Sequence, residues 1–147
     1  MTDPFELQRF IDAQAPVYTQ VMSELRSGRK RSHWIWFIFP QIAGLGHSAM
    51  ARRYAIASRD EAVAYLAHPT LGPKLRECTQ VVCDIQGRSI EQILGSPDDI
   101  KFRSSMTLFE AVSGDPMFRN ALDKFCAGAS DSATLAVMER LLEGPKT

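Results

Sequence analysis

The residues with the clearest potential for chemistry lie in the segment SHWIWFIFPQIAGLGHS, which spans residues 32–48. It holds both tryptophans of the chain and two of its three histidines, and basic residues flank it at 29–31 and 52–53. Glycines followed by the free N–H groups of a helix start are typical of an anion site, and clustered cations favour the same ligand. We interpret the segment as a candidate site for a phosphate-like group. Solvated surface charge is the alternative for the cations.

Gly44 and Gly46 come just before Ser48, which is expected to cap a helix that runs to Ile56. A G-x-G spacing is common, and this one lacks the third glycine of the dinucleotide fingerprint and any Walker pattern. The pair therefore fits either a structural turn or a seat for phosphate.

The aromatic and imidazole side chains of the segment also have two interpretations. Trp34 and Trp36 fit either the hydrophobic core or the border of a pocket. His33 and His47 stand in neither an H-x-x-x-H nor an H-E-x-x-H spacing. The sequence therefore predicts no metal site, and no cofactor is predicted either.

A second polar segment, DDIKFRSSMTLFE, spans residues 98–110. Lys101, Ser104 and Ser105 share one helical stripe, so a cation and two hydroxyls would face the same way. Arg103 would supply further positive charge, and Thr107 a third hydroxyl. The hydroxyls could hold a phosphate, a ribose or a carboxylate, or they could permit close helix packing and bond to carbonyls of the preceding turn.

Together, the two segments predict one ligand site formed when the chain folds. The candidate set is Lys30, His33, Trp34, Trp36, Gln41, Gly44, Gly46, Ser48, Lys101, Arg103, Ser104, Ser105 and Thr107. The favoured function is binding, with or without processing, of a small anionic metabolite such as a nucleotide or an ADP-ribose-like molecule. The alternative is a non-catalytic module for protein interaction or homodimerisation, in which the aromatic block forms an apolar patch. The sequence leaves catalysis undecided.

The elements that must position these residues are helical almost throughout, because the apolar residues recur at helical spacing. An all-α fold of six or more short helices is expected, with one irregular or helical aromatic segment at 33–42. Helices are predicted within 3–14, 17–27, 58–68, 70–87, 96–114, 115–128 and 131–144.

Capping residues mark several of these helix starts. Asp3, Ser96 and Asp115 each precede a proline and are predicted to be N-caps. Ser58 and Glu61 predict a capping box. In the last helix, the residues expected to face the core are Leu135, Met138, Leu141 and Leu142.

Length and composition limit the class of protein. With 147 residues, 45% hydrophobic and 23% charged, the chain is expected to form one helical domain over 1–147. Seventeen basic and 17 acidic residues cancel, so nucleic acid is the least favoured partner. Three cysteines without a paired framework predict reduced thiols. No membrane span or secretory signal is recognised, which favours a cytoplasmic protein.

Three blocks, SHWIWFIFPQIAGLGHS, EAVAYLAHPTLGPKL and DDIKFRSSMTLFEAV, carry a resemblance that runs over nearly the whole chain. In order and spacing they resemble a bacterial domain-of-unknown-function family numbered 1810. The resemblance implies a mainly helical fold without an established activity, and marks 33–48 and 101–107 as distinctive segments. Some members carry the label calpastatin, an inhibitor of calcium-dependent cysteine proteases. Such inhibitors bind as disordered polar repeats, whereas this chain has core residues and no repeats.

Overall fold

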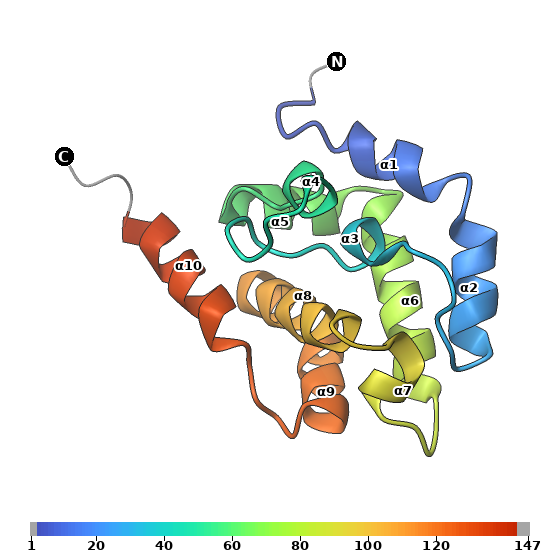
Figure 1. The fold of residues 1–147 in the computed structure, drawn as a ribbon. Helices are drawn as coiled ribbons and strands as arrows, with labels where there is room; N and C mark the ends of the chain where they lie inside the picture. Colours follow the sequence, from blue (N-terminus) through green and yellow to red (C-terminus); the bar gives the residue numbers. More distant parts are fainter. Residues whose placement is uncertain (1–2, 144–147) are drawn as a thin grey trace.

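The structure of the chain is a computed structural model that describes residues 3–143, with side chains through residue 141. Within that range the chain forms ten helices and no strand, so the predicted all-α fold is confirmed. Figure 1 shows how the helices are arranged. The helices are α1 Gln8–Gln14, α2 Tyr18–Arg26, α3 Ile35–Ile38, α4 Ala49–Arg53, α5 Arg59–Ala67, α6 Leu71–Asp84, α7 Ile90–Leu94, α8 Asp98–Ser113, α9 Pro116–Phe125 and α10 Ser132–Glu143.

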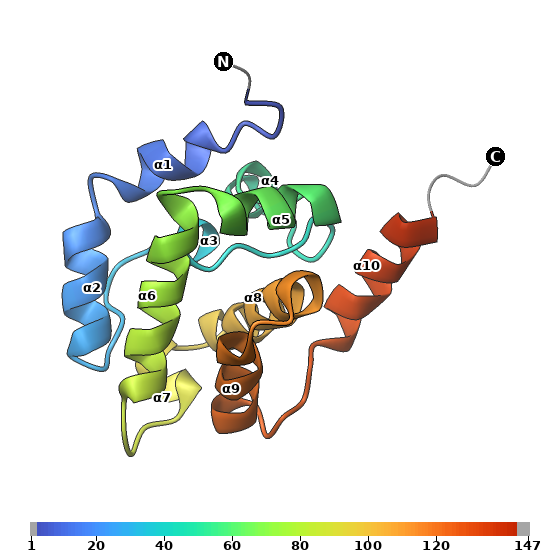
Figure 2. The same cartoon turned by 180° about the vertical axis from the view of Figure 1, so that it is seen from behind.

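Helix α8 is the element around which the others pack. It contacts α3, α5, α7, α9 and α10, while α6 contacts α2, α5 and α9. Figures 1 and 2 show α1 and α2 on one side of the molecule and α10 on the opposite side. The serine-rich helix predicted at 96–114 is therefore central rather than peripheral.

Buried apolar side chains form one contiguous cluster between these helices. Phe39 and Phe102 meet edge to face with ring centroids 5.0 Å apart, and this contact joins the aromatic segment to α8. The ring centroids of Tyr65 in α5 and Phe109 in α8 are 5.5 Å apart. Aromatic pairs at these separations add to the free energy gained by burying their area.

The aromatic segment forms the short helical turn α3, as one of the two predicted alternatives requires. The chain then runs extended and makes an isolated parallel bridge between Ile42 and Ile56. Trp34, Phe37 and Phe39 are buried, whereas Trp36 is half-buried. The aromatic segment thus belongs mainly to the hydrophobic core, and its aromatic side chains do not form an exposed patch.

The caps predicted beside prolines have mixed outcomes. Asp115 is the N-cap of α9 and accepts a 3.0 Å hydrogen bond from the Met117 N–H, as predicted. Ser96 is wrong as a cap, because the N-cap residue of α8 is Pro97 and no side chain caps this helix.

Asp3 is also wrong as the N-cap, because α1 begins only at Gln8. Glu6 takes a positive φ of 53°, which interrupts the helix predicted from Pro4. The Asp3 carboxylate nevertheless accepts 2.9 Å hydrogen bonds from the N–H groups of Leu7 and Gln8. It therefore binds orphan donors of the first turn from outside the helix.

The capping box predicted at Ser58 and Glu61 is only half formed. Ser58 accepts from the Glu61 N–H, but the Glu61 carboxylate binds the Ala57 N–H at 2.9 Å and Arg9 at 2.8 Å. A complete capping box occurs instead at Ser89 and Gln92, at the start of α7.

The last helix faces the core differently from its prediction. Met138 is buried, but Leu135 and Leu141 are each 43% exposed, so their predicted inward orientation is wrong. Thr134 is buried instead. Leu142 lies outside the described side chains. The stripe that meets α8 is therefore rotated toward Thr134, whose hydroxyl and N–H both bond to Asp131.

Candidate functional site

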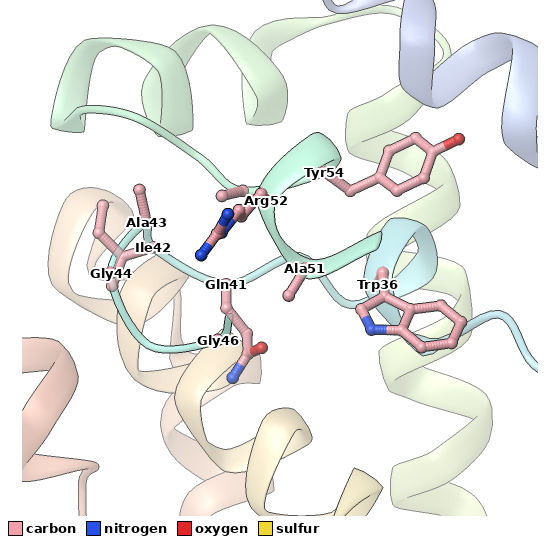
Figure 3. Close-up of a pocket in the computed structure, with 10 residues that line it drawn as sticks. Trp36, Gln41, Ile42, Ala43, Gly44, Gly46, Ala51, Arg52 and Tyr54 are labelled. Carbon is pink, nitrogen blue, oxygen red and sulfur yellow. The ribbon is translucent and has the colours of Figure 1, made fainter. Parts of the chain in front are cut away.

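Two adjoining cavities lie where the predicted segments meet. The first, which we name the Trp36 cavity, has a volume of about 140 Å³ and is lined by Trp36, Gln41, Gly44, Gly46, Arg52 and Tyr54, with Ile42 and three alanines (Figure 3). The second, the Ile100 cavity, has a volume of about 260 Å³ and is lined by Leu45, Pro97, Ile100, Lys101, Ser104 and Ala133, with Gln41, Gly46 and Asp131. Gln41 and Gly46 line both.

A bridged loop and a short helix form the wall of the Trp36 cavity. The Ile56 N–H donates to the Gln41 carbonyl at 2.8 Å, and the Ala43 N–H donates to the Ile56 carbonyl at 2.8 Å. These bonds fix the entry to the glycine loop. Gly44 then adopts a φ of +100°, a conformation that favours glycine.

Gly46 is required by close packing. A Cβ placed on it would lie 2.6 Å from the Cβ of Ala51 in α4. Ser48 caps that helix by accepting a 3.1 Å hydrogen bond from the Ala51 N–H, as predicted, but Ser48 is exposed and lines neither cavity. The helix has five residues and ends at Arg53 instead of reaching Ile56. The glycines thus serve as a structural turn that also borders a cavity.

Hydrogen-bond donors dominate the polar lining of the Trp36 cavity. The Trp36 indole N–H is buried and has no hydrogen-bond partner in the described structure. The side chains of Arg52 and Gln41 likewise form no ion pair or hydrogen bond with described residues. In Figure 3, Trp36 turns its nitrogen edge toward the side where Gln41 lies, and Arg52 extends toward the glycine loop. No carboxylate occurs among the described lining residues.

In the Ile100 cavity, by contrast, the polar groups bind one another. The Ser104 hydroxyl donates to the Asp131 carboxylate at 2.9 Å, and that carboxylate also accepts from the Thr134 N–H at 3.1 Å. Lys101 lies 3.8 Å from Asp98, and its ammonium sits 5.2 Å from the centre of the Trp36 ring. Lys101 therefore places positive charge beside both cavities.

Several predicted site residues have structural partners away from the cavities. The Lys30 ammonium pairs with Asp98 at 2.8 Å and lies 5.1 Å from the centre of the Trp34 ring. Arg103 donates 2.8 Å hydrogen bonds to the carbonyls of Ala129 and Ser130. Neither cation lines a cavity.

The remaining predicted residues lie in the core or at the surface. Thr107 donates to the Arg103 carbonyl at 2.8 Å and accepts from the Asp131 N–H at 2.9 Å. Ser105 is fully buried, and its hydroxyl has no partner among described residues. His33 is exposed.

Trp34 is part of a carboxylate-centred loop rather than of the cavity wall. Its indole N–H donates to Glu24 at 3.0 Å, and that carboxylate also accepts from the Arg31 N–H at 2.7 Å and the Ser32 N–H at 2.9 Å. Burial raises the pKa of Glu24, but these hydrogen bonds and one from the Ser32 hydroxyl outweigh it and lower the pKa to about 2. Glu24 thus stays charged and orders the chain before α3.

Sequence reasoning did not place Arg52, Tyr54 or Asp131 in the candidate set. Arg52 is one of two adjacent arginines that follow the glycine loop. Only the direction in which each side chain leaves α4 distinguishes Arg52, which lines the cavity, from Arg53, which does not. No sequence signal marks Asp131 as the partner of Ser104, because their pairing depends on how the chain returns from α9 to α10.

Neither a cluster of metal ligands nor a membrane-spanning helix occurs among the described residues. Within 3–143, no group of three His, Cys, Asp or Glu side chains is arranged to hold a metal ion. No described helix is both long and apolar enough to cross a bilayer.

These features define a class of small all-α proteins in which a glycine loop and a serine-bearing central helix border adjoining cavities. The chain belongs to the family described as "Protein of unknown function (DUF1810)", whose model matches residues 4–138. A similar solved structure is the conserved hypothetical protein Rv1873 from Mycobacterium tuberculosis, with 54% sequence identity and a TM-score of 0.92. The similarity covers 93% of this chain and 99% of that one. No match is found among curated proteins.

Proposed function

We propose that this protein binds a small anionic metabolite in the Trp36 cavity. The observation that supports the proposal is that Trp36, Gln41 and Arg52, whose side-chain donors have no partner among described residues, line one hollow without a lining carboxylate. A buried N–H without an acceptor costs about 1–3 kcal/mol, and a bound anion would remove that cost. An anion would also accept from the guanidinium through charge-assisted hydrogen bonds.

The charge for this function comes from Arg52, with Lys101 nearby. Lys30 and Arg103, which the sequence favours for this role, already bind Asp98 and two backbone carbonyls. A guanidinium can contact carboxylate or phosphate with two parallel N–H groups, so Arg52 supplies both charge and orientation. Nucleotides and ADP-ribose-like molecules belong to the ligands to be tested.

Cysteine chemistry does not fit a catalytic function at this site. Burial raises the pKa of Cys78 to about 12 and also raises the pKa of Cys83 and Cys126. A thiol needs a lowered pKa to act as a nucleophile near neutral pH. None of the three lines the Trp36 cavity. The proposed function is therefore binding, with no catalytic step assigned.

The test compares Arg52→Gln with the matched control Arg53→Gln. Both side chains are exposed on α4, but Arg53 does not line the Trp36 cavity. Inorganic phosphate, short carboxylates, AMP and ADP-ribose are the probes, and thermal unfolding and calorimetry are the measurements. A bound probe at about 100 times its Kd should raise stability by about 2.7 kcal/mol, or roughly 5–10 °C in Tm.

We expect Arg52→Gln to weaken binding of an active probe at least about tenfold, because a hydrogen bond to a charged group is lost. Arg53→Gln should leave the affinity within about twofold of the wild type. If no anion changes the Tm of the wild type, or if both substitutions have the same effect, the proposal is overturned.

A further inference from the structure

We propose that the ligand is an amphiphilic monoacid, with one carboxylate in the Trp36 cavity and an apolar body in the Ile100 cavity. This inference rests on the proposed function and names the class of ligand. It follows from the opposite character of two cavities that share Gln41 and Gly46 as common walls. We therefore place one ligand across both cavities.

The first step concerns the head group. Arg52 is the one charged side chain among the described residues that line the Trp36 cavity, so a single negative charge balances it. A carboxylate has two oxygens and about four lone-pair sites, which suit a guanidinium fork, an indole N–H and an amide N–H. The volume of about 140 Å³ is well below the roughly 300 Å³ at which pockets for drug-sized ligands begin. This volume favours a compact head.

The second step concerns the body. Ser104 and Asp131 are already hydrogen-bonded to each other, so they leave few polar groups for a ligand in the Ile100 cavity. The remaining wall is largely apolar, from Leu45, Pro97, Ile100 and Ala133. A ribose placed there would bury hydroxyls without partners, which is unfavourable. An alkyl or aryl body would need no hydrogen-bond partners.

The third step concerns Ile100 and Lys101. Ile100 is 56% exposed, and among the large apolar side chains of the described structure only Val63, Leu135 and Leu141 are also classed as exposed. An apolar body in the cavity would cover part of this surface. The Lys101 ammonium, held beside the Trp36 ring and Asp98, lies next to the head group and adds attraction for an anion.

The experiment measures affinities of butyrate, hexanoate and octanoate by calorimetry, with hexanamide as the uncharged analogue. We expect affinity to rise by up to about fourfold for each added methylene, the factor that corresponds to about 0.8 kcal/mol. Hexanamide should bind at least about tenfold more weakly than hexanoate, because it lacks the charge that Arg52 binds.

Ile100→Ser and Val63→Ser form the matched pair of variants. Val63 is 50% exposed on α5 and lines neither cavity. Ile100→Ser should reduce the gain in affinity from butyrate to octanoate and leave butyrate binding nearly unchanged. Val63→Ser should have no effect on either. Denaturation curves of both variants show whether each remains folded.

Failure of this inference can be distinguished from failure of the proposed function. If phosphate, AMP or ADP-ribose binds through Arg52 while the carboxylates show no dependence on chain length, the monoacid is overturned and anion binding stands. If Ile100→Ser has the same effect as Val63→Ser, the assignment of the body to the Ile100 cavity is wrong. If no anion binds, both proposals fail.

Discussion

At the scale of single residues, Glu24 shows how one side chain can order a loop that has little secondary structure. It is 6% exposed, and its carboxylate accepts bonds from the backbone of Arg31 and Ser32 and from the Trp34 indole. Without Glu24, the buried Trp34 indole N–H and two partly buried backbone N–H groups would lose their acceptor. Glu24 therefore acts on the site indirectly, by fixing the segment that leads to Trp36.

We predict that Glu24→Gln lowers the free energy of unfolding by about 2–3 kcal/mol at neutral pH, because an amide group would face donors that need an acceptor. Urea denaturation measures the effect. Glu91→Gln is the control, since Glu91 is exposed on α7 and has no side-chain hydrogen bond to a described residue. Equal stabilities of the two variants would contradict the role assigned to Glu24.

A comparison of the wild type with Glu24→Gln at different pH values tests the charge of Glu24. Its folded-state pKa of about 2 lies below the ordinary value of 4.5. The stabilisation is therefore fully present above about pH 5 and is lost as pH falls toward about 2. The difference in unfolding free energy between wild type and Glu24→Gln should shrink over that interval. A difference that stays constant down to pH 2 would show that ionisation of this carboxylate is not involved.

At the scale of elements, the polar face of α8 attaches the C-terminal helix. Thr107 accepts the Asp131 N–H, Ser104 donates to the Asp131 carboxylate, and Arg103 binds carbonyls of the preceding loop. The unusual hydroxyl content of this helix correctly indicates a role beyond helix propensity. Ser104 and Thr107 also donate to carbonyls of their own preceding turn, as the interpretation of these hydroxyls as packing residues predicts.

We predict that Asp131→Ala loosens α10 without unfolding the remaining helices. The substitution removes the acceptor of Thr134 and Ser104, and each lost hydrogen bond is worth about 1 kcal/mol. Hydrogen exchange should therefore show at least about tenfold lower protection in α10, with α6 and α8 little changed. Glu139→Ala, an exposed position on α10, is the control. Unchanged protection in Asp131→Ala would contradict this attachment.

Helix starts show what local sequence can and cannot predict. Asp115 caps α9 as its local sequence predicts, with Pro116 at the first helical position. Asp3 and Ser96 carry the same signal, yet α1 starts at Gln8 and α8 at Asp98. At Asp3 the positive φ of Glu6 places the cap outside the helix. Propensity identifies the helices, whereas tertiary contacts shift their boundaries by a few residues.

At the scale of the whole molecule, helical periodicity predicts the all-α class but not which side chains share a cavity. The contact between Phe39 and Phe102 brings the aromatic segment onto α8, and it places Gln41 and Gly46 opposite Lys101 and Ser104. Adjacency of the segments could be hypothesised from their polar content. Our proposal of Arg52 rather than Lys30 depends on the path of the folded chain, because Lys30 is paired with Asp98 and lines neither cavity, whereas Arg52 lines the Trp36 cavity.

The two tryptophans provide an internal test of this arrangement. Trp34 is 1% exposed, whereas Trp36 is half-buried and borders a cavity. Of the two single-tryptophan variants, Trp34→Phe, which retains Trp36, should be quenched by acrylamide more strongly than Trp36→Phe, which retains Trp34. A bound anion should protect Trp36 alone, because it occupies the hollow beside that ring and leaves Trp34 in the core. Equal quenching of the two variants without ligand would contradict the described burial, and protection of Trp34 rather than Trp36 would place the ligand elsewhere in the molecule.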